Sequence, residues 1–255
     1  MPVDTAILLA AGLGTRLKPL TNSVPKCLAP INGTPLLYYW IDNLVRMGVK
    51  RIFINTHYFV AQVVKAVQQH PERNIIELVY EDKLLGTAGT VRNILNKYAI
   101  DSPNVFIAHA DNLCFCNWFN FLDYHANRKA NIEVTMMAFQ TDTPSSCGIL
   151  EVDEENQLLA FHEKVENPPG NLANGAVYIF SDKALKAFRI SKIELPDISL
   201  DIIPSLLGAI QVWENTVYLR DIGTPISYQQ AQSDVLKYID SKPLIDGQMS
   251  HKITP

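Results

Sequence analysis

The feature that most constrains the fold is a regular alternation of short apolar runs with amphipathic segments over the first 111 residues. The apolar runs, at residues 3–10, 51–55, 75–80 and 104–111, have the character of strands buried in a parallel sheet. The segments between them have helical spacing: one follows the pair Thr34 and Pro35 and ends before Gly48, and the others cover residues 60–69 and 90–98. The alternation predicts right-handed crossovers, with helices on both faces of the sheet.

The second half of the chain is mixed in character. Strand-like runs cover residues 132–139, 148–152, 157–163 and 175–180, and helical patterns cover residues 183–189, 199–208 and 225–238. No linker and no internal repeat divides the chain. We therefore expect one α/β domain over residues 1–240, a Rossmann-like, mixed but mainly parallel sheet with an antiparallel insertion. The polar residues 241–255 are expected to be loosely held.

Charge and composition exclude several classes of protein. The 255 residues are 47% apolar, which is enough for a buried core, and 26 acidic residues outnumber 22 basic ones. The resulting net charge of −4 argues against a nucleic-acid-binding protein, which is usually basic. The N-terminus has no basic leader and no span of membrane length, and the four scattered cysteines lack zinc-ligand spacing. We expect a cytoplasmic protein with reduced thiols and no membrane contact.

The stretch LLAAGLGTRLKPLTNSVPKCLAPINGTPLL, residues 8–37, contains two close glycines and three basic residues but no carboxylate. A dinucleotide-binding fingerprint would need glycine where Leu17 stands, and no Walker A ending follows. The loop nevertheless has the features by which both motifs bind phosphate. Gly12 and Gly14 allow backbone N–H groups to approach phosphate oxygens, and Arg16 and Lys26 add positive charge. A phosphate-binding loop is favoured over the alternative, a solvated surface loop.

Two aspartates indicate a metal site beside this loop. Asp111 ends a hydrophobic strand, where open α/β sheets bind ligands, and Asp221 ends the strand-like run TVYLRD. One or two carboxylates together with phosphate oxygens are the usual ligands of Mg²⁺. For Asp221 the alternative is a role in the turn before Pro225.

Six motifs, in order, resemble those of the sugar-1-phosphate nucleotidylyltransferases over about 230 residues, nearly everything but the tail. They are the loop LLAAGLGTRLKPLT…PKCLAPINGTPLL, the segment LLGTAGTVRN, HADN around Asp111, FHEKVENPP, NGAVYIF and RDIGTP. The resemblance is strongest to mannose-1-phosphate guanylyltransferase-like enzymes that lack a C-terminal hexapeptide-repeat domain. Departures from the family pattern are His109 and Ala110 before the metal aspartate, Val165 after Glu-Lys, and Arg220 in place of tryptophan.

The resemblance implies a role for each matching residue. It places catalysis on Arg16, Lys26, Asp111 and Asp221, with Mg²⁺ held by the two aspartates. It places nucleotide binding on Ala10, Ala11, Gly12, Gly14, Thr15, Glu81, Gly86, Thr87 and Gly89. Sugar-phosphate binding falls to Gly148, Glu163, Lys164, Asn174 and Gly175. Residues 1–111 would then mainly bind the nucleotide and residues 112–220 the sugar phosphate. Family members often self-associate, which leaves a homo-oligomer open.

The implied reaction explains the loop composition. A sugar-1-phosphate oxygen attacks the α-phosphorus of a nucleoside triphosphate (NTP), and pyrophosphate leaves. The nucleophile already carries negative charge, since the second pKa of a phosphate monoester is about 6, so no general base is required. The barrier comes from repulsion between anions, which cations and positioning reduce. A carboxylate in the loop would add negative charge and raise this barrier.

The sequence constrains the identity of the base and of the sugar less tightly than it constrains the type of reaction. Pro25-Lys26-Cys27-Leu28 differs from the Ser-Lys-Gln-Leu of thymidylyltransferases, and Gly86-Thr87-Ala88-Gly89 resembles the guanylyl type. We expect Gly89 to leave backbone groups free to approach a purine, and Glu81 or Asp82 to accept hydrogen bonds from guanine. This predicts guanylyl transfer to mannose-1-phosphate or a manno-configured heptose-1-phosphate. Alternatives are a uridylyltransferase acting on an amino-sugar phosphate such as N-acetylmuramate-1-phosphate, a phosphocholine-type cytidylyltransferase, and a catalytically silent subunit.

Overall fold

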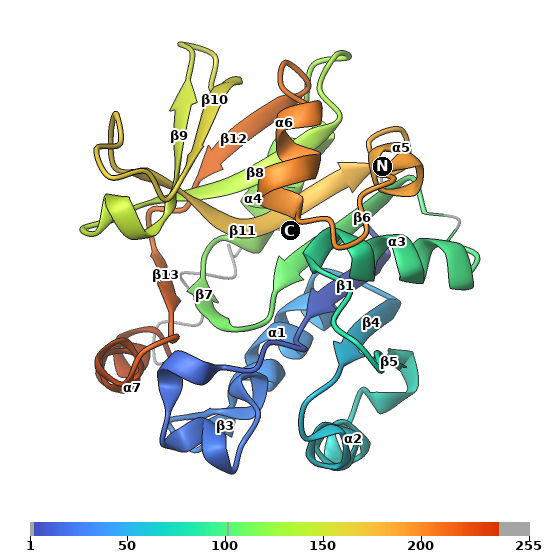
Figure 1. The fold of residues 1–255 in the computed structure, drawn as a ribbon, viewed down its shortest axis with the longest axis vertical. Coiled ribbons are helices and arrows are strands. Elements are labelled where there is room, and N and C mark those ends of the chain that lie inside the picture. Colours follow the sequence, from blue (N-terminus) through green and yellow to red (C-terminus); the bar gives the residue numbers. More distant parts are fainter. Residues whose placement is uncertain (1–2, 101, 240–255) are drawn as a thin grey trace, which may run out of the picture.

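A computed structural model describes residues 3–100 and 102–239, so the predicted tail at 241–255 lies outside the described residues. Its centre is a nine-stranded sheet in which β10-β9-β11-β6-β1-β4-β5 form one path and β8, paired with β11, carries β12 (Figure 1). The strands are β1 (Thr5–Leu9), β4 (Arg51–Thr56), β5 (Ile76–Tyr80), β6 (Asn104–His109), β8 (Val134–Gln140), β9 (Gly148–Val152), β10 (Leu158–Glu163), β11 (Leu172–Ser181) and β12 (Ile210–Glu214). The first four of these are parallel, and β11 is antiparallel to β6.

The helices cover both faces of the sheet, as the alternation predicts. Successive residues of β1 point to opposite faces, so Ala6 and Leu8 belong to one apolar cluster and Ile7 and Leu9 to another. The first cluster is completed by α1 (Leu36–Arg46), α2 (Val60–Gln69) and α4 (Trp118–Ala126). The second is completed by α3 (Thr87–Lys97), α5 (Leu185–Ile190), the π-turn η6 (Ile198–Ile202) and α6 (Ile203–Ser205). No helix within the described residues is long and apolar enough to cross a membrane.

Three local predictions were wrong in detail. Thr34 and Pro35 do not begin a helix but form the short strand β3, which pairs with β2 (Pro30–Ile31) around Asn32 and Gly33, both at positive φ. Helix α3 begins at Thr87 rather than Thr90. Residues 199–208 form no regular α-helix, because the π-helical η6 runs directly into the short α6 and residues 206–208 form a turn.

A third cluster positions the N-terminal loop. The loop contains short 3₁₀ turns, η1 (Thr15–Leu17), η2 (Leu20–Asn22) and η3 (Lys26–Leu28), and two further turns, η4 (Arg73–Ile75) and η5 (Pro144–Ser146), lie elsewhere. Leu17 of η1 packs with Ile222 and with Ala231 and Val235 of α7 (Pro225–Ile239). Figure 1 shows α7 beside this loop, so the end of the domain holds its beginning in place.

A small second sheet brings distant aspartates together. Strand β7 (Asn112–Phe115) follows Asp111 directly and pairs antiparallel with β13 (Tyr218–Asp221). In this register Asp221 lies opposite Asn112. Two carboxylates 110 positions apart in sequence therefore meet at the edge of the main sheet.

Candidate active site

Lys26 lies between the two predicted metal ligands. Its Nζ is 2.8 Å from Oδ2 of Asp111 and 2.6 Å from Oδ1 of Asp221. Lys26 is only 5% exposed, because η3 packs it inside the loop, whereas both carboxylates remain partly open to solvent. The structure thus brings Lys26, Asp111 and Asp221 to one point, with the ammonium bridging the acids.

The charges of this trio stabilise one another. Burial by itself lowers the pKa of Lys26, but the adjacent Asp111 and Asp221 outweigh it and the pKa is raised. Burial likewise raises the pKa of Asp111, and the opposing effects of Lys26 and His109 leave it lowered. At neutral pH the ammonium and the Asp111 carboxylate are therefore both ionised.

The donor set fits a divalent cation. Two carboxylates reach within 3 Å of a single cationic atom, which shows that both can face one small ion. Mg²⁺ takes one or two protein carboxylates and completes its shell with phosphate and water oxygens. Asp111 and Asp221 would hold such an ion, and it would neutralise charge on bound phosphates.

The glycine-rich loop presents an exposed arginine next to this trio. Arg16 is 72% exposed at its side chain, and its Nη2 lies 3.6 Å from Oδ2 of Asp221. Gly14 has φ of 62°, and its carbonyl accepts hydrogen bonds from the Thr21 hydroxyl and the Leu17 N–H. A Cβ at Gly14 would lie 2.8 Å from Thr21 Cγ2, whereas a Cβ at Gly12 would meet nothing. The loop is therefore folded tightly at Gly14 and open at Gly12.

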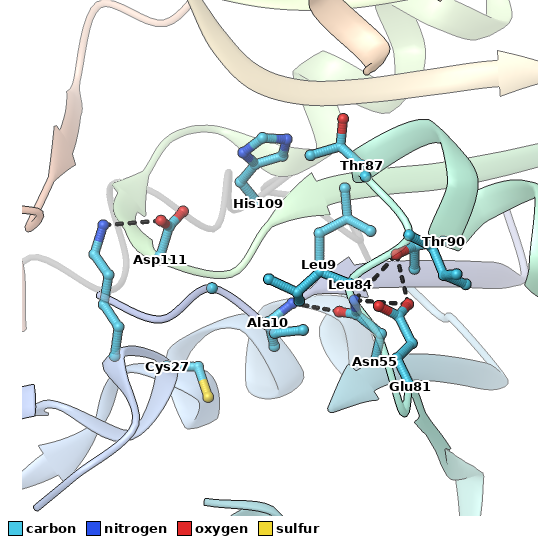
Figure 2. Close-up of a pocket in the computed structure, with 15 residues that line it drawn as sticks. Leu9, Ala10, Cys27, Asn55, Glu81, Leu84, Thr87, Thr90, His109 and Asp111 are labelled. Atoms are coloured by element: carbon cyan, nitrogen blue, oxygen red, sulfur yellow. Dashed lines mark hydrogen bonds and ion pairs between the residues drawn. The ribbon is translucent and has the colours of Figure 1, made fainter. Parts of the chain in front are cut away.

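A cavity of about 300 Å³ extends from Asp111 and Lys26 across the carboxyl ends of β6, β1, β4 and β5 (Figure 2). Its lining contains Leu9, Ala10, Ala11, Gly12, Lys26, Cys27, Asn55, Glu81, Leu84, Leu85, Gly86, Thr87, Thr90, His109 and Asp111. Six of the predicted nucleotide-binding residues are in that lining. Gly14, Thr15 and Gly89 are not.

A buried polar network forms the end of the cavity farthest from Asp111. Asn55 accepts a hydrogen bond from the Ala10 N–H at 2.7 Å and donates to Oε1 of Glu81 at 3.1 Å. The Thr90 hydroxyl donates to the same oxygen at 2.5 Å. Oε2 of Glu81 is buried and has no partner among the described residues. Glu81 therefore has one carboxylate oxygen fixed and one unsatisfied.

The expectation for Gly89 is not met. Its N–H donates to the carbonyl of Pro196 at 3.3 Å, and the N–H of Ala88 donates to the same oxygen at 3.0 Å. A Cβ at position 89 would lie 3.2 Å from Leu85 Cβ and 3.3 Å from Pro196 Cδ. The glycine allows α3 to pack on the segment before η6, and its N–H is not free to approach a purine.

The predicted sugar-phosphate residues gather on β9, β10 and β11. Gly148 lies against Glu163, because a Cβ added at Gly148 would be 2.6 Å from Oε2 of Glu163. The Glu163 carboxylate in turn forms an ion pair with Lys164 at 2.6 Å. Asn174 donates to the Tyr178 hydroxyl and accepts the Ala176 N–H, and this holds an irregularity in the pairing of β11 with β8. The Gly175 carbonyl accepts a hydrogen bond from Asn112. None of the five lines the cavity that contains Glu81.

A family model described as nucleotidyl transferase matches residues 5–238. The chain belongs to this family. A mannose-1-phosphate guanylyltransferase of Mycobacterium tuberculosis is 29% identical over an alignment that covers 97% of this chain and 69% of that relative. A glucose-1-phosphate adenylyltransferase of Clostridium beijerinckii is 26% identical over an alignment that covers 91% of this chain and 66% of that relative. The chain thus spans about two thirds of each relative.

Solved structures agree with the nucleotidyl transferase fold. The crystal structure of HddC from Yersinia pseudotuberculosis complexed with GMP-PN superposes with a TM-score of 0.75, covering 91% of this chain and all of that one. Its sequence identity of 24% supports the fold alone. The expected mainly parallel α/β sheet and the resemblance to the sugar-1-phosphate nucleotidylyltransferases are confirmed.

Two residues that hydrogen-bond to Glu81 were not among the predicted site residues of this nucleotidyl transferase. Asn55 and Thr90 fix Oε1 of Glu81, yet neither was singled out. Asn55 could have been found, because a polar residue near the carboxyl end of an otherwise apolar buried strand points to a ligand site. Thr90 gave no such signal, since a threonine in the first turn of a helix is common.

Proposed function

We propose that the protein transfers a nucleotidyl group from an NTP to a sugar-1-phosphate, with GTP and mannose-1-phosphate, or a manno-configured heptose-1-phosphate, as its substrates. The observation that carries this proposal is the bridge of Lys26 between Asp111 and Asp221 beside a carboxylate-free glycine loop. The bond that forms joins a sugar-phosphate oxygen to the α-phosphorus. The bond that breaks joins that phosphorus to the oxygen leaving with pyrophosphate.

The residues of this chain lower the barrier by charge and position. Lys26 and Arg16 reduce the repulsion between the two anionic substrates, and the open backbone at Gly12 lets the phosphates approach closely. Lys164, exposed on the sugar side, would bind the phosphate of the incoming sugar. No side chain needs to remove a proton, because the nucleophile is already ionised.

Glu81 supports a guanine base. Its unpaired Oε2 would accept a hydrogen bond, and guanine presents two donors on one edge, N1–H and the N2 amino group. Adenine and cytosine each place an acceptor, N1 or N3, beside a single amino donor, so part of their edge would repel the carboxylate, whereas guanine offers two adjacent donors. Uracil and thymine offer one donor, so uridylyl transfer is the second candidate. Asp82, the other predicted acceptor, is exposed and outside the cavity lining.

A substrate matrix tests the proposal. Pyrophosphate release is measured with Mg²⁺ and each of GTP, UTP, dTTP, ATP and CTP against mannose-, glucose-, N-acetylglucosamine- and N-acetylmuramate-1-phosphate. We expect GTP with mannose-1-phosphate to have the highest kcat/KM. If UTP or dTTP exceeds GTP tenfold with every sugar, guanylyl transfer is wrong while nucleotidyl transfer stands. Absence of release with every pair would overturn both.

A variant pair tests the role of Glu81. Glu81→Gln replaces an acceptor with an amide that can turn a donor toward the base, so the preference for GTP over ATP should fall by about ten- to a hundredfold. Asp82→Asn changes the neighbouring exposed acid in the same way and should leave the preference within twofold. Equal effects of the two substitutions would contradict the assignment.

A further inference from the structure

His109 ends β6 at the carboxyl edge of the sheet, between two functional halves. On one side it is in register with Leu9 of β1, which leads into the glycine loop. On the other side the preceding residue, Ala108, pairs with Val177 of β11, just past the irregular stretch that holds Asn174 and Gly175. His109 is therefore the cavity-lining residue at which the nucleotide side of the sheet meets the sugar side.

The imidazole of His109 makes no hydrogen bond or ion pair with any described residue. The other four described histidines differ: His57 contacts the Glu81 carbonyl, His70 pairs with Asp42, His125 lies between Thr135 and Asn104, and His162 contacts Glu151. Of these five histidines, His109 is also the only one that lines the cavity. Its two ring nitrogens are thus available to a ligand.

The position of His109 along the cavity indicates which part of a ligand it meets. Glu81 follows β5 and Asp111 follows β6, three strands away in the order β6-β1-β4-β5. At about 4.8 Å between strands, this separates the two ends of the cavity by roughly 14 Å, room for a base at one end and phosphates at the other. His109 ends β6 two residues before Asp111, and Figure 2 shows its ring between Asp111 and Thr87, where the phosphate end of the cavity passes into the middle of this span.

The chemistry of the middle differs from that of the ends. Phosphates have cations at Lys26 and Arg16, and the base has Glu81, so the remaining polar parts of the two substrates are ring hydroxyls. An imidazole nitrogen can donate or accept a hydrogen bond, which suits a hydroxyl, because a hydroxyl does both. We propose that His109 hydrogen-bonds a ring hydroxyl of a bound sugar, either the ribose of the NTP or the hexose of the sugar phosphate, and so helps to select substrates. This inference rests on the proposed function.

The test removes each partner of the hydrogen bond in turn. The kcat/KM is measured for wild type, His109→Leu and His109→Asn with GTP, 2′-deoxy-GTP and 3′-deoxy-GTP, and with mannose-1-phosphate and its singly deoxygenated analogues. In the wild type, removal of the bound hydroxyl should cost about three- to tenfold. His109→Leu should abolish that cost for the same analogue alone, and His109→Asn, which keeps a donor and an acceptor, should retain most of it.

The analogue that loses its penalty identifies the source of the hydroxyl. A deoxynucleotide assigns His109 to the ribose, and a deoxy sugar phosphate assigns it to the hexose. Unchanged ratios for every analogue in His109→Leu and in His109→Ala, with both variants folded by thermal unfolding, would overturn the inference while leaving the proposed function intact. A wild-type protein inactive with every substrate pair would overturn the proposed function and this inference with it.

Discussion

The ammonium group of Lys26 lies 2.8 Å from the carboxylate of Asp111 and also binds Asp221 at 2.6 Å. A buried cation of the protein itself thereby holds the two acids close together. Any ion binding between Asp111 and Asp221 must share these oxygens with Lys26 or displace it.

Asp111→Asn and Asp221→Asn should each lower turnover by about two to four powers of ten, because each removes a charged ligand from the ion that neutralises the phosphates. Each variant should remain folded, since asparagine can still accept the Lys26 hydrogen bond. The measurement is pyrophosphate release across a Mg²⁺ titration, with circular dichroism as the fold control. Turnover near that of the wild type in both variants at limiting Mg²⁺ would contradict the assignment of Asp111 and Asp221 as metal ligands.

Lys26→Met should abolish most activity and yet tighten metal binding in the nucleotide-free protein several-fold, because two carboxylates then face each other without a cation. Mn²⁺ affinity, measured by electron paramagnetic resonance, reports this without substrate. Lys18→Met is the matched control, a solvent-exposed lysine of the same loop. An unchanged Mn²⁺ affinity in Lys26→Met would show that the ammonium does not compete for the site.

The first half of the fold could be predicted because its signals are local. The centre of a buried strand such as β4, residues 52–54, is apolar on both faces, and α2 was expected over the residues it occupies. Elements whose formation depends on distant partners were missed. Strand β7 exists because β13 pairs with it, and α4 and β12 complete layers that only the folded domain defines. Thr34 looked like a helix cap, but pairing with Ile31 prevailed.

The site was predictable in composition but less so in arrangement. The spacing of motifs pointed to Asp111, Asp221 and Lys26, and the structure brings these three together. No sequence pattern showed that Lys26 bridges both acids, because that depends on the β7–β13 register. Gly89 illustrates the converse: a glycine can serve helix packing as readily as ligand approach, and only Pro196, 107 residues later, decides between them.

Lys164→Ala should raise the KM for sugar phosphate about tenfold while the KM for GTP stays within twofold, because the proposed function places this lysine beside the sugar phosphate. Its side chain is 64% exposed and, among the described residues, pairs with the adjacent Glu163, so little stability depends on it. Lys183→Ala is a matched control, since Lys183 is 67% exposed and pairs with Glu133 away from the site. A sugar-phosphate KM that moves equally in both variants would remove Lys164 from the site.

Gly148→Ala tests whether Glu163 shapes the sugar site. The new Cβ would lie 2.5 Å from Phe161 Cζ and 2.6 Å from Glu163 Oε2, so both side chains must shift. We expect a loss of about 1–3 kcal/mol in the free energy of unfolding and a higher KM for sugar phosphate. Gly170→Ala, whose Cβ would meet nothing within 4 Å, should change neither. A sugar-phosphate KM equal to that of the wild type in Gly148→Ala would show that Glu163 takes no part in substrate binding.

Stability should fall in acid because of His125, which is fully buried against Thr135 and Asn104. Burial and then Arg128 lower the pKa of His125 to about 3, so between pH 6.5 and 3 the unfolded chain binds a proton that the folded protein does not. The unfolded state is favoured progressively over that range, by about 1.4 kcal/mol per pH unit from this group. Urea unfolding of the wild type and of His125→Gln at several pH values measures how much of the pH dependence of the unfolding free energy comes from His125. The variant should be less stable at pH 7 but lose stability less steeply below pH 6, and parallel curves for the two proteins would contradict the assignment.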